Sequence, residues 1–290
     1  MSAQAPVKMK SEAGLLDIWN RLRKNHLALF GLVIVVLLVF FAITADFIAP
    51  YRYDQQNLMK AFESPSKEHF FGTDEFGRDI FSRIIHGSRI SLQVGMIAVG
   101  IAVVFGGLLG SVAGYYGGRI DNLIMRAMDI LLSIPSILLA IAIAASLGPG
   151  LYNMMVAVGI SSTPQYARII RGSVLSLRGQ EFVEAAKAVG SSDTRIILKH
   201  IIPNCLAPII VQSTLGVASA ILTAAGLSFI GLGIQPPTPE WGAMLSGGRE
   251  YIRDYAYMTI FPGLAIMITI LALNFLGDGL RDVLDPKLKR

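Results

Sequence analysis

Long runs without a charged residue are the feature that most restricts how this chain can fold. Five such runs occur among its 290 residues. A helix that crosses a bilayer needs about 20 consecutive apolar residues, and each run approaches or exceeds that length. The third run is long enough for two helices, and the turn sequence Gly148-Pro149-Gly150 divides it. The pattern therefore predicts six transmembrane helices, from the runs 27–45, 90–118, 130–167, 201–239 and 255–277.

The composition agrees with a protein that crosses a membrane several times. Hydrophobic residues make up 53% of the chain and charged residues only 16%, whereas soluble domains carry about 25% charged residues. The net charge of +5 does not indicate a nucleic-acid partner, because membrane proteins collect Lys and Arg on their cytoplasmic side. Cys205 is the single cysteine, which excludes an intrachain disulfide. We therefore expect an all-α polytopic protein surrounded by the lipid bilayer.

The charged and uncharged runs divide the chain into consecutive segments. Residues 1–26 are predicted to hold an amphipathic helix that anchors at the membrane interface through Leu15, Leu16, Trp19 and Leu22 on one side. The other predicted segments are a first transmembrane helix at 27–48, an extracytoplasmic loop at 49–87, a membrane domain at 88–278 with spans near 90–114, 128–147, 151–170, 205–230 and 255–277, and a cytoplasmic tail at 279–290.

The distribution of Lys and Arg predicts the orientation of these segments. If both termini are cytoplasmic, the inner segments hold 17 Lys and Arg residues and the outer segments hold 8. Cytoplasmic segments of membrane proteins carry such an excess. We therefore expect the N- and C-termini inside the cell.

Small residues recur at four-residue spacing in two of the predicted spans. Gly106, Gly110 and Gly114 form one strip, and another comprises Gly216, Ala220 and Ala224. Such strips let two helix backbones approach closely. The contact is expected either within this chain or with another subunit. The prolines at positions 135 and 164 are expected to kink the third and fourth spans.

The segment between the fourth and fifth spans is charged and predicted to form helices. Gly190 can end a first helix in the left-handed conformation, and Ser191, Ser192 or Asp193 can cap a second helix. Pro203 is expected to bend that second helix towards the membrane. Short helices are marginal alone in water, so the membrane surface or a partner protein is expected to dock them.

The same segment resembles a loop of ATP-binding cassette (ABC) importer permeases. Glu184, Ala185 and Ala186 are followed by Gly190, and His200-Ile201-Ile202-Pro203 comes after nine intervening residues. The resemblance implies that this loop forms coupling helices between spans four and five, which sit in a cleft of the ATP-hydrolysing subunit. Glu184, Ala185, Ala186 and Gly190 are the implied coupling residues. His200 departs from the family pattern, which usually has an aliphatic residue there.

Three further stretches are similar to one branch of that family. They are FGTDEFGRDIFSRIIHGSRISL at 71–92, PPTPEWGAMLS at 236–246 and NFLGDGLRDVLDPKLK at 274–289. They resemble the C-type permeases of dipeptide, oligopeptide and nickel importers, most of all the dipeptide permease C subunits. Glutathione importers share much of the second stretch, so the solute stays open among these four.

The resemblance carries several implications about fold and partners. It implies the MetI-like permease fold in the cell membrane of a prokaryote, and a non-catalytic subunit that binds no cofactor. ATP and Mg²⁺ would be held by two separate ATPase subunits, identical or different. A second homologous permease and an extracytoplasmic solute-binding protein would complete the importer. The residues that line the solute path are not implied.

Charged and aromatic residues outside the segment between spans four and five can be interpreted structurally or functionally. Asp74, Arg78, Asp79 and Arg83 have helical spacing, which suits a solvated charged face or a surface near the binding protein. Trp241 suits the level of the lipid headgroups. Among the charges near the end of the chain, Asp278, Arg281, Asp282 and Asp285 are expected to be solvated anchors of span six on the cytoplasmic side.

Other function classes are weighed by what the sequence contains. It has no Gly-x-x-x-x-Gly-Lys loop, no His-Glu-x-x-His and no Cys-x-x-Cys. The four histidines are scattered, which disfavours a membrane enzyme. The predicted spans carry no ionisable residue in their interior, which disfavours an ion-driven secondary transporter. A scaffold that only uses the docking loop is the remaining rival, and ATP-dependent uptake would distinguish it from a permease.

Overall fold

The computed structural model describes residues 15–284, and the fold within them is helical. In chain order the helices are α1 (Leu15–Leu22), α2 (His26–Ile48), a 3₁₀ turn (Leu58–Lys60), α3 (Ile80–Tyr116), α4 (Gly118–Leu132), α5 (Ser136–Leu147), α6 (Leu151–Leu177), α7 (Glu181–Ala188), α8 (Asp193–Ile196), a π-helical segment (Ile197–Ile201), a 3₁₀ segment (Ile202–Cys205), α9 (Leu206–Phe229), α10 (Trp241–Gly248), a 3₁₀ turn (Arg249–Tyr251) and α11 (Tyr257–Leu284). The all-α prediction is confirmed.

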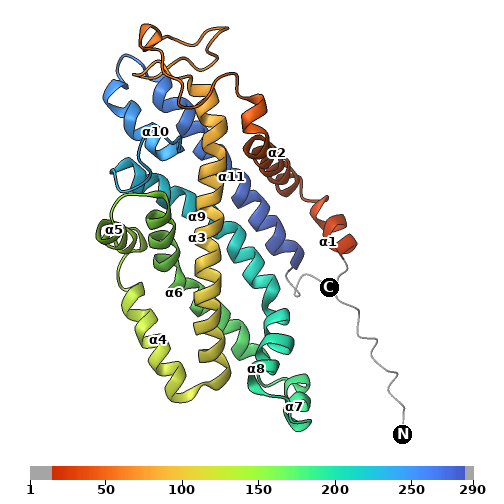
Figure 1. The fold of residues 1–290 in the computed structure, drawn as a ribbon. Helices are drawn as coiled ribbons and strands as arrows, with labels where there is room; N and C mark the ends of the chain where they lie inside the picture. The colour runs from red at the N-terminus through yellow and green to blue at the C-terminus, as the bar shows by residue number, and fades with distance from the viewer. Residues whose placement is uncertain (1–14, 285–290) are drawn as a thin grey trace.

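Four of these helices are long and apolar enough to cross a membrane. They are α2, α3, α11 and the helix that runs through Asp193–Phe229; α4 and α5 together make a fifth candidate if they are one bent span. The predicted fourth span, α6, is absent from this group of candidates among the described residues. It carries Arg168 and Arg171 near its end and lies against α3, α5 and α9 inside the bundle. The count of six spans therefore stays a prediction (Figure 1).

Local sequence determines where several helices begin and break. Asn25 caps α2 by accepting a hydrogen bond from the backbone N–H of Ala28, at 3.1 Å. Asp79 caps α3 in the same way through Ser82. This helix begins at Ile80, so residues 80–87, which were expected in the outer loop, are helical. Helices α4 and α5 are bent by 88° at Pro135, as the proline predicted.

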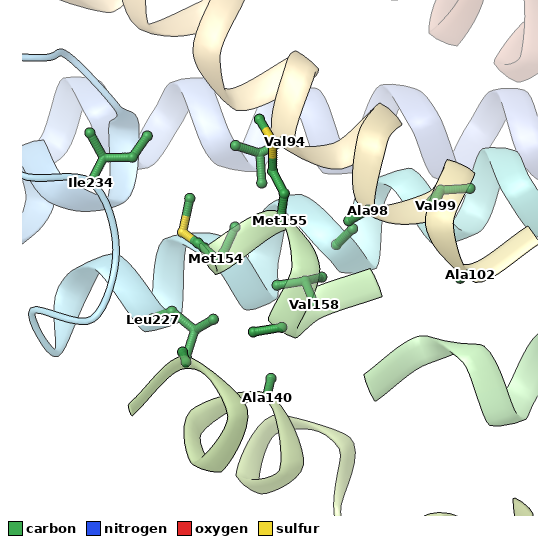
Figure 2. Packing of buried hydrophobic residues seen from close by; sticks show 14 of the residues in the cluster. Val94, Ala98, Val99, Ala102, Ala140, Met154, Met155, Val158, Leu227 and Ile234 are labelled. Atoms are coloured by element: carbon green, nitrogen blue, oxygen red, sulfur yellow. The ribbon is translucent and has the colours of Figure 1, made fainter. Parts of the chain in front are cut away.

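The main hydrophobic core lies where α3, α5, α6 and α9 meet. Figure 2 shows Val94 and Ala98 of α3 near Met155 and Val158 of α6. Small residues of α5 and α9 complete the cluster, so four helices approach one another closely around it. The other members include Val99, Ala102, Ala140, Ala144, Met154, Ala157, Tyr166, Ala220, Ala224, Leu227 and Ile234.

Both strips of small residues pack within this chain. A Cβ atom at Gly110 would collide with the backbone oxygen of Ala167 in α6, and Gly106 and Gly114 also face α6. The second strip contributes Ala220 and Ala224 to the main core. Of the two expected contacts, packing inside the chain is therefore the one that the structure contains.

The first helix packs on the end of the last one. Leu22 of α1 and Ala28 of α2 are buried against Val283 of α11. Trp19, predicted to share the apolar side of the helix, is 43% exposed. The rest of the predicted N-terminal segment at 1–14 and the tail at 285–290, with Asp285, lie outside the described residues.

Candidate functional site

The predicted coupling residues lie at one end of the helical bundle. Helices α7 and α8 project there between α6 and α9, and segment 49–79 lies at the opposite end (Figure 1). Glu184, Ala185 and Ala186 are in α7, and Gly190 follows that helix by two residues. All four are therefore brought together on one small projecting unit.

Helix α7 has two distinct faces. Val183 and Ala186 point into the protein, with 0% and 7% of their surface exposed. Glu184 and Ala185 are exposed, so they form the face that a partner can reach. Of the two alanines, Ala185 is therefore open to another molecule, whereas Ala186 is occupied by contacts inside its own chain.

A second hydrophobic cluster holds α7 in place. It joins α7 to α3, α6 and the residues after α8, and its members are Tyr115, Ile170, Val174, Val183, Ala186, Ile196, Ile197, Ile201 and Cys205. An eight-residue helix is marginal alone in water, and here the chain itself supplies the packing on one side. The inner face of α7 therefore does not depend on lipid or a partner, contrary to the expectation for the whole helix.

Gly190 closes α7 with a left-handed turn. Its φ is +78°, a region that side chains with a Cβ atom disfavour. The N–H of Gly190 donates to the carbonyl of Lys187 at 2.9 Å, and the N–H of Ser191 donates to that of Ala186 at 3.0 Å. This pair of bonds is the Schellman arrangement, which satisfies the last carbonyls of a helix. The predicted helix stop is therefore present.

A contact that the sequence does not reveal fixes the turn after Gly190. The hydroxyl of Tyr115, at the end of α3, donates to the carboxylate of Asp193 at 2.7 Å. The ammonium group of Lys187 lies 5.3 Å from the centre of the Tyr115 ring. Tyr115 therefore touches both sides of the turn, on α7 and on α8. Asp193 had been predicted only as a helix cap.

We expect Tyr115→Phe to loosen this turn without unfolding the protein. The change removes one hydrogen bond to a charged group, which contributes about 1.5–3 kcal/mol when buried and less at this exposed aspartate. Hydrogen exchange of residues 186–196 should become faster. Tyr152→Phe is the control, because Tyr152 is 73% exposed and its hydroxyl makes no hydrogen bond within residues 15–284. Equal exchange in the two variants would contradict the role of Tyr115.

The second predicted coupling helix continues directly into the fifth span. Its helical turns run through Asp193–Phe229 as one 37-residue helix, with a π-helical segment at Ile197–Ile201 and a 3₁₀ segment at Ile202–Cys205. Pro203 sits in the first turn of the 3₁₀ segment, where its missing N–H is tolerated. The expected separate second helix is therefore wrong, because the helical turns pass through Pro203 into α9. His200 is half-buried in the π-helical segment, and its carbonyl accepts a hydrogen bond from Asn204.

Ion pairs brace the base of this unit. Arg171 of α6 binds Asp121 of α4 through two hydrogen bonds, one of them 2.7 Å from Nη2 to Oδ2. Arg168 binds Asp129 one turn further along the same pair of helices, at 2.6 Å. Both arginines therefore hold α4 against α6 near the coupling unit.

The opposite end of the bundle contains a buried cluster of charges. Asp74, Arg78 and Arg83 are 4–6% exposed, so the interpretation as a solvated face is wrong. Arg78 Nε lies 2.6 Å from Asp74 Oδ2, and Arg83 Nε lies 3.6 Å from the same oxygen. Arg83 also donates to the backbone oxygens of Tyr53 and Pro237. The cluster therefore ties the loop before α3 to the loop before α10.

Asp79 and Trp241 also make contacts that the sequence does not reveal. Asp79 does not pair with Arg83; it accepts from Ser82 and contacts Nδ1 of the buried His69 at 2.9 Å. Trp241 is 1% exposed, so its ring packs inside the protein, and its Nε1 donates to the carbonyl of Ile84. Its neighbour Glu240 caps α10, and burial raises the pKa of this carboxyl above its ordinary value. These contacts make the loops before α3 and α10 part of the protein interior.

Within residues 15–284, no group of three or more His, Cys, Asp or Glu side chains is arranged to hold a metal ion. Cys205 is buried in the cluster under α7. The exposed face of α7, with Glu184 and Ala185, is a surface that another molecule can reach.

Comparison with known families decides what kind of chain this is. The model of the binding-protein-dependent transport system inner membrane component matches residues 106–290, more than half of the sequence and including α7 and α8. The chain belongs to this family. The N-terminal transmembrane domain of oligopeptide transport permease C matches residues 15–65 of this transport component.

Curated relatives extend over almost the whole chain. A dipeptide transport system permease protein DppC of Alkalihalophilus pseudofirmus is 52% identical over 94% of this chain and 90% of its own length. A glutathione transport system permease protein GsiD of Escherichia coli O6:K15:H31 is 49% identical with the same coverages. A di/tripeptide transport system permease protein DppC of Pseudomonas aeruginosa is 46% identical over 95% of this chain and 93% of its own. The transport component is thus an ABC importer permease, as the resemblance implied.

Solved structures support the fold. The MetNI methionine ABC transporter in an inward-facing form matches with a TM-score of 0.57 and 19% identity, over 69% of this chain and 96% of the other. An amino acid ABC transporter structure matches with a TM-score of 0.53 and 17% identity, over 69% of this chain and 94% of the other. The predicted MetI-like permease fold is confirmed.

Proposed function

We propose that this chain is the membrane-spanning subunit of a peptide importer and translocates dipeptides or oligopeptides with energy from separate ATPase subunits. The observation that carries the proposal is the exposed face of α7, where Glu184 and Ala185 project from a helix that the chain holds firmly from behind. Two relatives named as dipeptide or di/tripeptide permeases, at 52% and 46% identity, support the solute class.

The proposed assembly has three kinds of protein partner. One of two ATPase subunits takes the exposed face of α7, and the other docks on the equivalent helix of a second homologous permease, which completes the path. A solute-binding protein delivers peptide at the end of the bundle that carries segment 49–79. The excess of Lys and Arg on the side of the termini supports a cytoplasmic position for α7 and an inner-membrane location.

Energy is transmitted by movement of the docked helices. ATP binding closes the two ATPases, which draws the docked α7 helices together. Because α7 is packed on α3 and α6, that movement is passed to the bundle and turns it from inward-facing to outward-facing. Hydrolysis then resets the subunits. This chain contributes position and packing, and the partner subunits hold ATP and Mg²⁺.

A charge reversal on α7 tests the docking surface. We expect Glu184→Arg to reduce the amount of ATPase that co-purifies with the chain by about tenfold. The introduced arginine would repel the basic groups of the partner that Glu184 attracts. Glu250→Arg is the matched control, because Glu250 is also an exposed glutamate but lies in the 3₁₀ turn after α10, at the opposite end of the bundle from α7. The two changes alter the net charge equally. A similar loss in both variants, or in neither, would contradict a docking role for Glu184.

The solute is tested with the same assembled importer. In vesicles that contain the complex and its binding protein, ATP-dependent uptake of a labelled dipeptide should be competed by unlabelled dipeptides. Glutathione is the second candidate, because the 49% identical relative is named for it. If only glutathione competed, glutathione would be the transported solute. Uptake without ATP would contradict the proposal that the complex is an ATP-driven importer.

A further inference from the structure

A shallow hollow lies where the first two helices meet the last one. Its volume is about 660 Å³, and it is lined by Arg21, Lys24, Asn25, His26, Leu27, Asp282 and Val283. The connection from α1 to α2 forms one wall, and the end of α11 forms the other. The hollow lies at the start of α2, a candidate membrane span, so it faces the level of the lipid headgroups.

The walls of this hollow are fixed by packing. Leu22 is 5% exposed and Ala28 is 0% exposed, and both lie against Val283. Gly279 faces Ala28 so closely that a Cβ atom on the glycine would collide with it. The basic side chains therefore project from a rigid support rather than from a freely moving terminus.

The hollow carries an excess of positive charge. Arg21, Lys24 and His26 are exposed, and none of them makes an ion pair with another residue of the described chain. Asp282 is the one acidic residue among the lining residues, and it is also exposed. Arg21 and Lys24 therefore outweigh Asp282 even with His26 neutral, which favours an anionic occupant.

An apolar strip continues from the hollow along α2. Leu27, Phe30 and Val33 are 59%, 56% and 50% exposed on the described surface. The other side of α2 packs on α11, where Gly31 faces the backbone of Ala272. A molecule with an anionic group and long hydrocarbon chains would place its anionic group in the hollow and its hydrocarbon chains along the apolar strip. That combination is the chemistry of an anionic phospholipid.

We propose that this hollow is a binding site for the headgroup of an anionic phospholipid. Basic pockets between membrane helices hold such headgroups by charge attraction, and acyl chains then follow the apolar helix surface. Occupation would tie α1 and the start of α2 to the surrounding leaflet. The proposal does not depend on which solute the importer carries.

The test measures lipid retained by the purified importer complex. Native mass spectrometry would compare phosphatidylglycerol with phosphatidylcholine of the same acyl chains. We expect the double variant R21Q/K24Q to bind phosphatidylglycerol about 30-fold more weakly, from about 1 kcal/mol for each basic residue near a membrane surface. The matched control is R119Q/R126Q, which removes two other exposed arginines outside the hollow. Control and wild type should bind equally.

A second variant keeps the proposal testable if R21Q/K24Q does not fold. D282N removes the negative charge from the hollow and is expected to tighten phosphatidylglycerol binding about fivefold, by the same charge estimate. Equal losses in the two double variants would overturn the site in favour of diffuse attraction. Equal binding of both lipids, or no change in D282N, would also overturn it. Full displacement of phosphatidylglycerol by inorganic phosphate would assign the hollow to free phosphate instead.

Discussion

Replacing Gly190 with valine is expected to reduce ATP-driven uptake below about a tenth of the wild-type rate, while the chain still reaches the membrane. The φ of +78° at this position costs an L-residue about 1–2 kcal/mol, and a β-branched residue more. No neighbouring atom lies near the position of an added Cβ, so the effect arises from the backbone rather than from a collision. Valine would therefore open the Schellman turn and change the angle at which α7 meets its partner.

A graded series and a matched glycine make this result specific. Gly190→Asn should keep most uptake, because asparagine tolerates the left-handed conformation, and Gly190→Ala should fall between the two. Gly179→Val is the control, since this glycine lies just before α7, has no neighbours near its Cβ position and does not have a positive φ. Uptake and the amount of co-purified ATPase are measured together. Normal uptake by Gly190→Val, or equal defects at both glycines, would sink the explanation.

Gly110→Leu is expected to prevent the bundle from forming. A side chain at this position would meet the backbone of Ala167 and Arg171 in α6, and a backbone cannot move aside as a flexible side chain does. Overpacking a close contact costs about 1–3 kcal/mol and more where no relaxation is available. We therefore expect more than about 3 kcal/mol of destabilisation and loss of the protein from the membrane fraction.

The same substitution at Gly100 provides the comparison. Gly100 is on the same helix, is exposed, and has open space around its Cβ position. Gly100→Leu should keep the melting temperature of the detergent-solubilised protein or raise it, because glycine inside a helix is unfavourable by about 0.5–1 kcal/mol relative to alanine. If Gly110→Leu melted at the same temperature as Gly100→Leu, the close contact of α3 with α6 would not be important for stability.

The sequence predicted the helices better than it predicted their surroundings. Runs without charge located α2, α3, α9 and α11, because hydrocarbon excludes unpaired charges. The same reasoning located helix α6, whose role as a span stays a prediction. The ion pairs of its two arginines with aspartates of α4 could not be predicted, because pairing across helices leaves no trace in local periodicity. The kink at Pro135 was predictable, since proline disrupts a helix wherever it occurs in its interior.

The candidate site was predictable in position but not in its orientation. The run from Glu184 to Gly190 indicated a helix and its stop, and both are present. Which alanine faces outward depends on the cluster beneath α7, whose members come from α3, α6 and the segment after α8. Asp74 and Arg83 were misread for a related reason: whether spaced charges are solvated or buried is decided by the loops that fold over them.

Helix α3 joins the two ends of the molecule as a single rod. Its 37 residues correspond to a length of about 55 Å at 1.5 Å per residue. Its first turn is anchored beside the buried charges of the outer segment, and Tyr115 at its last turn holds Asp193. Suppose that a protein bound near the first turn of α3 shifts this helix and thereby changes the affinity of α7 for its partner. Thermodynamic reciprocity then requires that the partner at α7 changes the affinity for the first protein by the same factor. Binding of the solute-delivering protein and binding of the ATPase would then be coupled by one free energy, transmitted through α3.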